Sequence, residues 1–404
     1  MVRIMEGIRV LEVAAWTYVP SAGAVLAEWG ADVIKIEHPD TGDPQRGLVN
    51  SGLVPSGPGG VNHMIELPNR GKRSVAIDLK SPDGRQLLLE LAGRSDVFLT
   101  SFLPHVRRSL GIDVDDIRAA NPNIIYVRGS GQGQRGPEAE KGGFDGASFW
   151  FRAVADILTP EGEWPIPPAG PAFGDLLGGM TIAGGICAAL FHRERTGEAL
   201  VVDNSLLSTA MWATGASILA AGMFGISKLP RGDRTAGPNP LVNTYRTGDG
   251  RFLSLMMLQG DRFWPELVKA LGRPELADDP RFADGATRFE NRRECVGVLD
   301  EIFATRSLAE WREVLAQVEG VWAPVQTAGE LLEDPQAAAN GYVTELTHSS
   351  GTRFRMVPSP LQFDEQPGQL TPAPEHGEHT DEVLQELGLD MDRILDLKVK
   401  GAIL

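Results

Sequence analysis

The sequence predicts an α/β protein in which a doubly wound, parallel-sheet large domain is joined to a smaller α+β domain. First, short apolar runs typical of buried strands alternate with helical segments from Ile8 to Arg128. Second, the length of 404 residues exceeds what one hydrophobic core supports. Third, two apolar segments, 242–247 and 252–257, are joined across Gly248-Asp249-Gly250 in the pattern of a hairpin.

The opening elements form a predicted βαβ unit. Ile8–Ala14 is apolar enough for a buried strand, Pro20–Trp29 has a helical pattern, and Asp32–Glu37 is a second strand. The alternation continues with strands at 74–79, 97–100 and 124–128 and helices at 82–92 and 114–120. We expect a parallel sheet, because strands joined by crossover helices run in the same direction.

The rest of the chain departs from this alternation. The Gly- and Pro-rich segment 129–174 is long for a loop, which usually marks a functional segment. A helical pattern runs from Val202 to Phe224, and helices rich in Trp, Leu and charge follow the hairpin to about Val318. The tail predicts a strand at 353–356 and a last helix near 380–387. The predicted parts are a large domain at 1–200, a linker helix at 201–225, a small domain at 226–330 and a C-terminal segment at 331–404.

Composition narrows the functional class. The formal net charge of −16 argues against a nucleic-acid partner, because phosphate binding needs a basic face. The longest mostly apolar run, 176–191, is short for a membrane span, and the N-terminus has no signal-peptide pattern. The two cysteines, Cys187 and Cys295, fit a reducing compartment and no structural metal. We therefore expect a cytoplasmic protein that binds no nucleic acid, membrane or metal.

Asp175 is the candidate catalytic residue. It precedes a long apolar helix rich in small residues, and Gly174 before it allows a close backbone approach. We expect Asp175 at the helix N-cap, where the helix dipole favours the ionised carboxylate at neutral pH. An ionised carboxylate can act as a nucleophile. An Asp in such a local pattern is most often a purely structural cap, so the assignment as nucleophile depends on the rest of the chain.

A series of motifs accompanies this segment. Gly174-Asp175 is followed by a Gly/Ala-rich helix that ends in His192-Arg193-Glu194-Arg195-Thr196-Gly197. The other motifs, in chain order, are 7–12, 30–37, 69–74, 121–126, 279–282 and 377–384. In this order and spacing, over nearly the whole chain, the sequence resembles the family III CoA-transferases, which include formyl-CoA transferase and α-methylacyl-CoA racemase.

The resemblance implies an activity and an assembly. It implies transfer of CoA from an acyl-CoA donor to a free carboxylic acid, with Asp175 as nucleophile. The intermediates would be an aspartyl mixed anhydride and an aspartyl-CoA thioester, with coenzyme A as substrate and without a metal. Backbone amides of the Gly-rich loops are the natural oxyanion donors. The resemblance also implies an interlocked homodimer in which residues 331–404 return to complete the large domain.

The resemblance to the family also implies several CoA contacts, made by residues that follow strands of the large domain. Trp16 and Thr17 follow the first strand, where the family lines the thiol end of CoA. His38 stands where relatives carry an Arg, which weakens that contact at neutral pH because an unperturbed His is mostly uncharged. Phe102 matches the Phe of the family's Asn-Phe pair, although Ser101 replaces the Asn.

Three basic residues are further candidates for CoA contact. Lys72 and Arg73 lie where the family contacts CoA phosphates, and Arg and Lys are the usual phosphate ligands. Lys141 matches a Lys that reaches the cofactor in the family. Each also fits a solvated surface charge, so both interpretations stay open.

Other features decide between alternatives. Phe144 occupies the position of the racemases' catalytic His, and it cannot transfer a proton, while the adjacent Asp145 is expected to point elsewhere. Racemisation therefore ranks below CoA transfer, and a non-catalytic acyl-CoA-binding protein is a further alternative.

Residues 131–136 match G-x-G-x-x-G, but no helix follows, which disfavours a dinucleotide site. Residues 235–239 replace the family's glycine-rich lid, and Phe149–Phe151 with Trp164 indicates either an apolar acyl pocket or core packing.

Overall fold

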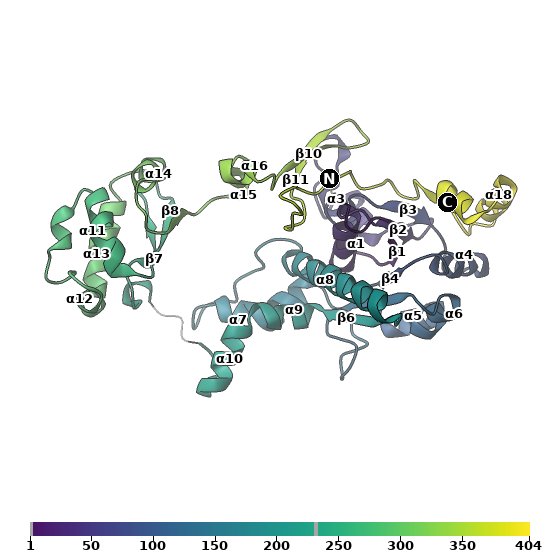
Figure 1. Ribbon diagram of the computed structural model, residues 1–404, viewed down its shortest axis with the longest axis horizontal. Coiled ribbons are helices and arrows are strands. Elements are labelled where there is room, and N and C mark those ends of the chain that lie inside the picture. Colours follow the sequence, from purple (N-terminus) through teal and green to yellow (C-terminus); the bar gives the residue numbers. More distant parts are fainter. Residues whose placement is uncertain (1–2, 230–232) are drawn as a thin grey trace. The chain divides into compact units, whose positions relative to one another are not determined.

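The computed structural model describes residues 3–229 and 233–404 (Figure 1). Residues 230–232, which fall within the predicted small domain, lie outside the described residues. The chain divides into a large unit of residues 1–229 and 335–404 and a small unit of residues 230–334.

A six-stranded parallel sheet forms the centre of the large unit, as predicted. Its strand order is β3-β2-β1-β4-β5-β6. The strands are β1 (Arg9–Val13), β2 (Asp32–Glu37), β3 (Arg73–Ala76), β4 (Val97–Thr100), β5 (Ile125–Ser130) and β6 (Val201–Ser205). The order reverses between β1 and β4, which makes the sheet doubly wound.

Helices cover both faces of this sheet because alternate strand residues point to opposite sides. Val10, Val33 and Val97 belong to one buried cluster, with α1 (Tyr18–Glu28) and α8 (Phe173–Thr196). Their neighbours in sequence, such as Leu11 and Phe98, belong to a second cluster, with α4 (Pro82–Ala92), α6 (Val114–Ala120), α17 (Thr380–Leu387) and α18 (Met391–Val399). The strands therefore read as continuous apolar runs, because both of their faces are buried.

Shorter elements complete the large unit. They are α2 (Pro44–Asn50), α3 (His63–Asn69), α5 (Pro104–Leu110), the π-helix η2 (Asp145–Val154), α7 (Ala155–Leu158), α9 (Leu206–Ala213), α10 (Gly215–Phe224), α16 (Pro335–Ala339) and the antiparallel pair β10 (Thr344–Thr347) and β11 (Arg353–Met356). The C-terminus contacts the sheet, since Asp78 donates its backbone N–H to the carbonyl of Ala402 at 2.9 Å.

The small unit has its own core around Trp264, Phe282 and Trp311. An antiparallel sheet of β7 (Val242–Arg246), β8 (Phe252–Met256) and β9 (Trp322–Pro324) packs with four helices. The helices are α11 (Gly260–Ala270), α12 (Gly285–Glu290), α13 (Arg292–Phe303) and α14 (Leu308–Leu315), and the short α15 (Ala328–Leu332) follows.

Two sequence expectations about elements are wrong. Residues 201–205 form β6, the edge strand beside β5, where the sequence pattern predicted the start of a linker helix. Only two of its five residues are apolar, and Asp203 pairs with Arg128 of β5 (2.6 Å), so the segment lacks the signal of a buried strand. The helix at 380–387 is present but is followed by α18, so it is not the last one.

Candidate active site

A cavity of about 180 Å³ lies at the carboxyl ends of β1, β4 and β5. This is the point where the strand order reverses, and ligands of open α/β sheets bind there. Its lining contains one carboxylate, that of Asp175. The lining residues are Ala15, Trp16, Tyr18, Ser101, Leu103, Gly129, Ser130, Gly131, Gly142, Gly143, Phe144, Asp175 and Leu206.

Asp175 lies in the first turn of α8 and not at its N-cap. The N-cap residue is Ala172, which has a left-handed backbone (φ 64°) and makes no side-chain cap. The predicted N-cap position was therefore wrong by three residues. The helix starts before the Gly-Asp pair, so the Asp175 carboxylate does not cap its own helix.

Glycines let α8 approach its neighbours closely. A Cβ on Gly174 would lie 2.3 Å from Cγ of Phe149 and 2.5 Å from Oδ1 of Asp145. One turn later, a Cβ on Gly178 would lie 2.3 Å from the ring of Tyr18 on α1. The close backbone approach expected at Gly174 is present, and its partners are side chains from η2.

Asp145, which the sequence pattern led us to expect to point elsewhere, faces the start of α8. Both of its carboxylate oxygens accept the backbone N–H of Gly174, each at 3.1 Å. It thereby occupies one of the N-terminal donors that the chain before α8 leaves uncapped. No local sequence pattern predicts this contact, because the capping residue lies 29 residues earlier in the chain.

The electrostatics of Asp175 also differ from expectation. Burial, together with the nearby charge of Asp145, raises the pKa of Asp175 to about 7. The predicted dipole effect does not hold Asp175 fully ionised, because burial and the negative charge of Asp145 both disfavour the carboxylate. At neutral pH the carboxylate and carboxylic acid forms of Asp175 are therefore both populated.

Trp16 lines the cavity together with Asp175. Its backbone is left-handed (φ 69°), which is uncommon for a residue other than Gly. The N–H of Trp16 donates to Oδ1 of the buried Asp43 at 3.2 Å, and Asp43 pairs with the buried Lys35 at 2.9 Å. The Trp16 ring meets Phe144 edge to face, with 5.4 Å between ring centroids.

Three other predicted CoA contacts follow strands at the same sheet edge without lining the cavity. Thr17 is buried and donates its hydroxyl to Gln45 at 3.0 Å. His38 follows β2 and is exposed, and its carbonyl contacts Nε2 of His376 at 2.9 Å. Phe102 follows β4 and is partly buried against the core face that carries α4.

Lys72 is fully buried in an ion pair. Its ammonium lies 2.7 Å from Oε2 of Glu12, and it also donates to the carbonyl of Pro20 and to Oδ1 of Asn69. Burial lowers the pKa of Lys72, and the charge of Glu12 opposes that shift. A phosphate contact would require the ammonium to leave these partners.

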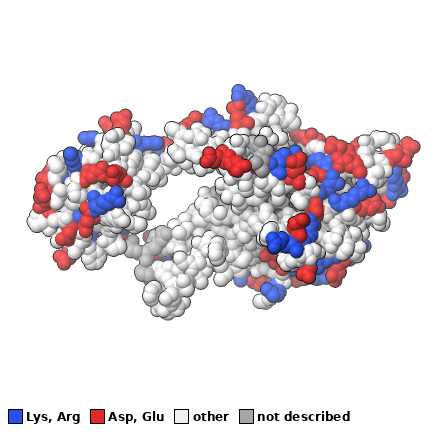
Figure 2. All heavy atoms as spheres, in the orientation of Figure 1, with Lys and Arg blue, Asp and Glu red and all other residues white. Residues whose placement is uncertain are grey.

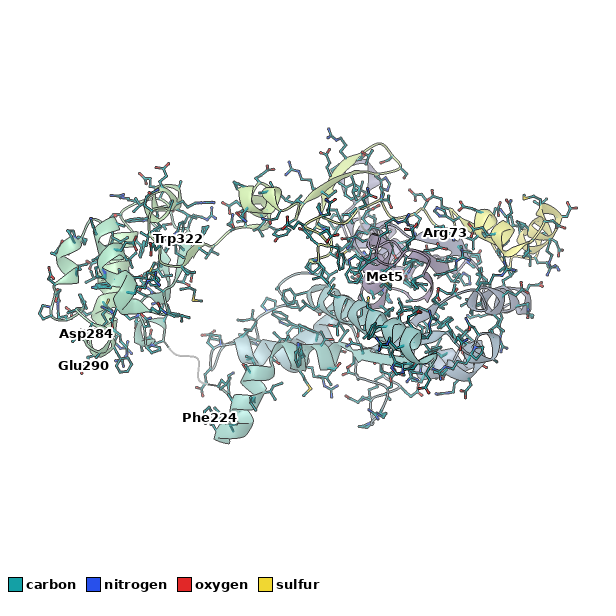
Figure 3. The ribbon with its side chains drawn as sticks, viewed as in Figure 1. Met5, Arg73, Phe224, Asp284, Glu290 and Trp322 are labelled. Carbon is teal, nitrogen blue, oxygen red and sulfur yellow. The ribbon has the colours of Figure 1, made fainter. Side chains whose placement is uncertain are left out.

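The structure does not bring Arg73 and Lys141 to the cavity. Arg73 begins β3, so it lies at the amino edge of the sheet, where it pairs with Asp32 and Glu386 at 2.7 Å each. Figure 3 shows it beside the C-terminal helices. Lys141 is exposed, and its ammonium pairs with Glu138 at 3.2 Å.

The aromatic cluster before Asp175 does not line the cavity. Phe149 and Trp150 are buried in the core with α8, as the packing alternative held. Phe151 and Trp164 are exposed. The aromatic side chains that do line the cavity are Trp16, Tyr18 and Phe144.

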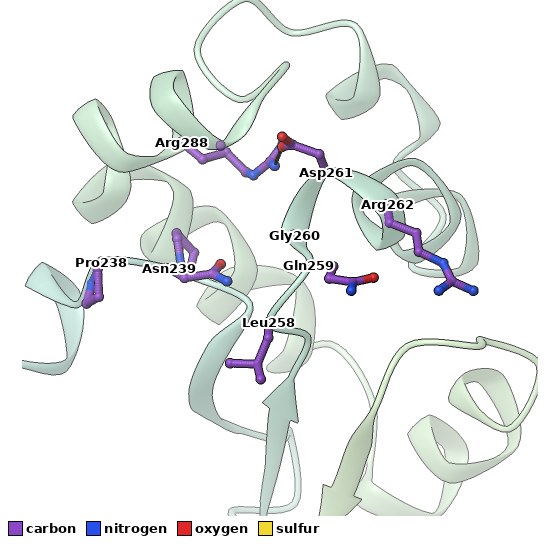
Figure 4. Close-up of a pocket in the computed structure, with 10 residues that line it drawn as sticks. Pro238, Asn239, Leu258, Gln259, Gly260, Asp261, Arg262 and Arg288 are labelled. Atoms are coloured by element: carbon purple, nitrogen blue, oxygen red, sulfur yellow. Dashed lines mark hydrogen bonds and ion pairs between the residues drawn. The ribbon is translucent and has the colours of Figure 1, made fainter.

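A separate cavity of about 510 Å³ lies within the small unit (Figure 4). It includes Pro238 and Asn239 of the segment that replaces the family's lid. Its polar groups serve the fold: Asn239 donates to the carbonyl of Met257 at 3.1 Å, and Arg288 pairs with Asp261. None of the residues predicted for catalysis or CoA binding lines it.

Comparison with known proteins identifies the family. The family model for CoA-transferase family III matches residues 5–380. The chain belongs to CoA-transferase family III. It is 32% identical to (R)-2-hydroxy-4-methylpentanoate CoA-transferase of Clostridioides difficile over 98% of both chains. It is 30% identical to cinnamoyl-CoA:phenyllactate CoA-transferase of Clostridium sporogenes, over 98% of this chain and 96% of the relative.

Solved structures agree with this family III assignment. A CAIB/BAIF family protein from Brucella suis superposes with a TM-score of 0.82 and 28% identity, covering 95% of this chain and 99% of the other. Rv3272 from Mycobacterium tuberculosis gives a TM-score of 0.78 at 27% identity, covering 94% and 98%. As a CoA-transferase, the protein uses CoA thioesters as substrates. Within residues 3–229 and 233–404, no group of three or more His, Cys, Asp or Glu is placed to hold a metal ion.

Proposed function

We propose that this CoA-transferase moves CoA from an acyl-CoA to a free carboxylic acid, with Asp175 as the nucleophile. The observation that carries the proposal is the position of Asp175, the one carboxylate lining a cavity at the switch point of the sheet. Its raised pKa makes the ionised form more basic than an ordinary aspartate, and basic carboxylates are better nucleophiles.

The first half-reaction converts Asp175 into a CoA thioester. A carboxylate oxygen of Asp175 attacks the thioester carbonyl, the C–S bond breaks, and CoA leaves as thiolate from a mixed anhydride. The thiolate then attacks the aspartyl carbonyl and expels the donor acid as a carboxylate. The acceptor carboxylate reverses these two steps, so the energy of the thioester bond is kept throughout.

The backbone around the cavity suits the negative charge that develops on the carbonyl oxygen. Gly131, Gly142 and Gly143 line it without side chains in front of their amides. A Cβ on Gly131 would lie 2.7 Å from Cα of Gly143, so the two loops meet at glycine. We propose amides of these loops as oxyanion donors.

CoA is proposed to lie along the carboxyl edge of the sheet. Trp16 would contact its thiol end, because it lines the cavity with Asp175. Thr17, His38 and Phe102 follow strands at this edge and remain proposed contacts, as does the exposed Lys141. Arg73 lies at the opposite edge and is left out of this path.

The alternatives find less support. Phe144 lines the cavity where a racemase needs a proton-transferring group, and its ring has none. The relatives described above are named for CoA transfer, which disfavours a non-catalytic acyl-CoA-binding role. The two free thiols, Cys187 and Cys295, accord with our proposal of a cytoplasmic enzyme.

We also propose a homodimer, supported by an uncovered apolar surface on α9 and α10. No residue of α10 is buried, and Trp212 of α9 is 87% exposed. Figure 2 shows the surface over these helices without charged side chains, and Phe224 protrudes at its end in Figure 3. By length and composition, α8 could span a membrane, and so could the bent pair α9–α10. A second copy of the chain is the occupant we propose for this surface.

Replacing Asp175 tests the nucleophile. We expect Asp175→Ala to abolish transfer and leave CoA affinity within a few-fold, because the carboxylate forms the covalent bond and adds little binding. The wild-type enzyme incubated with an acyl-CoA and hydroxylamine should give an aspartyl hydroxamate on the peptide containing Asp175, detected by mass spectrometry. Asp156→Ala, which removes an exposed carboxylate, serves as the control. Residual activity above about a thousandth in Asp175→Ala would exclude the nucleophilic role.

A further inference from the structure

The first turn of α8 is held by a residue outside the helix. Ala172 at its N-cap has no hydrogen-bonding side chain. Asp145 supplies the missing acceptor, because both of its carboxylate oxygens accept the N–H of Gly174. A side-chain cap typically contributes about 1 kcal/mol to a helix, here at the turn that carries the proposed nucleophile.

The position of Asp145 is fixed from its own side as well. It begins η2, a π-helical segment. Such segments are rare in proteins, and those that occur are often found at functional sites. Phe149, one turn further along, is buried in the core and packs against Gly174. The two segments therefore meet in a contact that leaves no room for a Cβ at position 174.

The charged and titratable groups near Asp175 in the described chain come from two elements. Asp145 faces it from η2, and Tyr18 faces it from α1. The hydroxyl of Tyr18 donates to Asn204 and is therefore occupied elsewhere. Asp145 is thus the carboxylate whose charge acts on Asp175.

We propose that Asp145 is a positioning residue that fixes the turn carrying Asp175 and whose negative charge makes the Asp175 carboxylate more reactive. This inference rests on the proposed role of Asp175 as nucleophile. When Asp175 attacks the thioester, its negative charge passes to the carbonyl oxygen and then to the departing sulfur of CoA. The mixed anhydride leaves Asp175 uncharged, so the repulsion with Asp145 is relieved on acylation.

Two substitutions separate the geometric from the electrostatic contribution. In Asp145→Asn the amide oxygen still accepts the N–H of Gly174, but the charge is gone. In Asp145→Ala both are lost. Asp156→Asn is the matched control, because Asp156 is an exposed carboxylate of α7 that pairs with Lys228.

We expect Asp145→Asn to move the acid limb of the kcat/KM profile to lower pH by about one unit, because one like charge near Asp175 is removed. Asp145→Ala should lower kcat about ten- to hundredfold and leave KM for the acyl-CoA within a few-fold, because the nucleophile is misplaced. Asp156→Asn should match the wild type. A wild-type pH profile in Asp145→Asn, or an equal loss of kcat in both Asp145 variants, would overturn the proposal.

A second readout is independent of turnover. The carboxyl carbon of Asp175 can be titrated by NMR in protein labelled with ¹³C-aspartate, its resonance assigned by its loss in Asp175→Asn. Its titration midpoint should fall in Asp145→Asn and stay unchanged in Asp156→Asn. An unchanged midpoint in Asp145→Asn overturns the electrostatic role, whereas failure of hydroxylamine trapping on Asp175 counts against the nucleophile and leaves this midpoint measurable.

Discussion

At the scale of single residues, the surroundings of Asp175 determine the protonation of its carboxylate. The folded state raises the pKa of Asp175 to about 7, above its unfolded value. The folded protein therefore binds this proton more tightly, and the contribution of Asp175 to stability falls as pH rises through the window up to about 7. The ionised form, which our proposal makes the nucleophile, is thus the form that the fold destabilises, a common compromise between activity and stability.

Lys72 is a residue at which a structural and a binding role predict different outcomes. We expect Lys72→Met to lower the free energy of unfolding by about 3–5 kcal/mol, because the buried carboxylates of Glu12 and Asp43 would then share the ammonium of Lys35 and one buried negative charge would be uncompensated. Arg73→Ala, the comparison variant, should cost only about 1 kcal/mol, because its partners Asp32, Glu382 and Glu386 are all at least partly exposed to solvent. Chemical denaturation measures both values.

Kinetics complete this comparison. If Lys72 has a structural role, the folded fraction of Lys72→Met should show the same change in KM for full acyl-CoA as for the truncated pantetheine thioester. A phosphate-binding Lys72 raises KM for the full donor alone, by roughly ten- to hundredfold, because only that donor carries the phosphates. The second pattern, with unfolding unchanged, would contradict the buried-pair interpretation.

The sequence predicted the residues at the cavity only in part. Asp175 and Trp16 were predicted, and both line it. Asp175 precedes a helix with a recognisable pattern, whereas Trp16 was carried over from the family resemblance. The role of Asp145 was not predictable, since a cap from 29 residues away leaves no local pattern. The burial of Lys72 was also not predictable, because its partner Glu12 lies on β1, 60 residues earlier in the chain.

At the scale of elements, prediction succeeded where both faces of a strand or one face of a helix are buried. Helices 82–92 and 114–120 and the strand at 32–37 have the predicted bounds. The edge strand β6 was not predicted because it is short and ends in polar residues. The π-helix η2 was not predicted because it lies in a Gly- and Pro-rich segment without a regular apolar pattern. The strand pattern is a burial pattern, so it fades at the sheet edge.

The packing of α8 on α1 depends on glycine. We expect Gly178→Ala to lower the free energy of unfolding by about 1–3 kcal/mol, because its Cβ would lie 2.3 Å from the Tyr18 ring and would push α8 away from α1. Gly184→Ala is the matched control in the same helix. Its Cβ meets nothing within 4 Å, so helix propensity should make that variant about 0.5–1 kcal/mol more stable.

Thermal and chemical denaturation of the two variants give the comparison. Because Tyr18 and Asp175 line the same cavity, Gly178→Ala should also reduce kcat, whereas Gly184→Ala should not. Equal stability of the two variants would show that α8 and α1 can separate without cost, contrary to the close packing described here.

At the scale of the whole molecule, the apolar surface of α9 and α10 is the one through which we propose that two chains associate. Leu219 is 64% and Met223 72% exposed, in addition to Trp212, which is far more apolar surface than isolated exposed residues account for. We expect the wild type to have about twice the chain mass of 43.6 kDa in light scattering after size-exclusion chromatography. Trp212→Asp combined with Leu219→Glu should yield a monomer or an aggregate, because charges on this surface oppose its burial.

The control for this prediction is Val399→Asp, which adds a charge to an exposed apolar residue of α18, away from α9 and α10. It should leave the dimer intact, because single exposed apolar residues are ordinary surface features. A wild type that is monomeric in solution would contradict the dimer. A monomer that also sediments with phospholipid vesicles would assign the apolar surface to a membrane instead. If the wild type is a dimer and only the α9–α10 variant loses it, the apolar surface of α9 and α10 is the dimer interface.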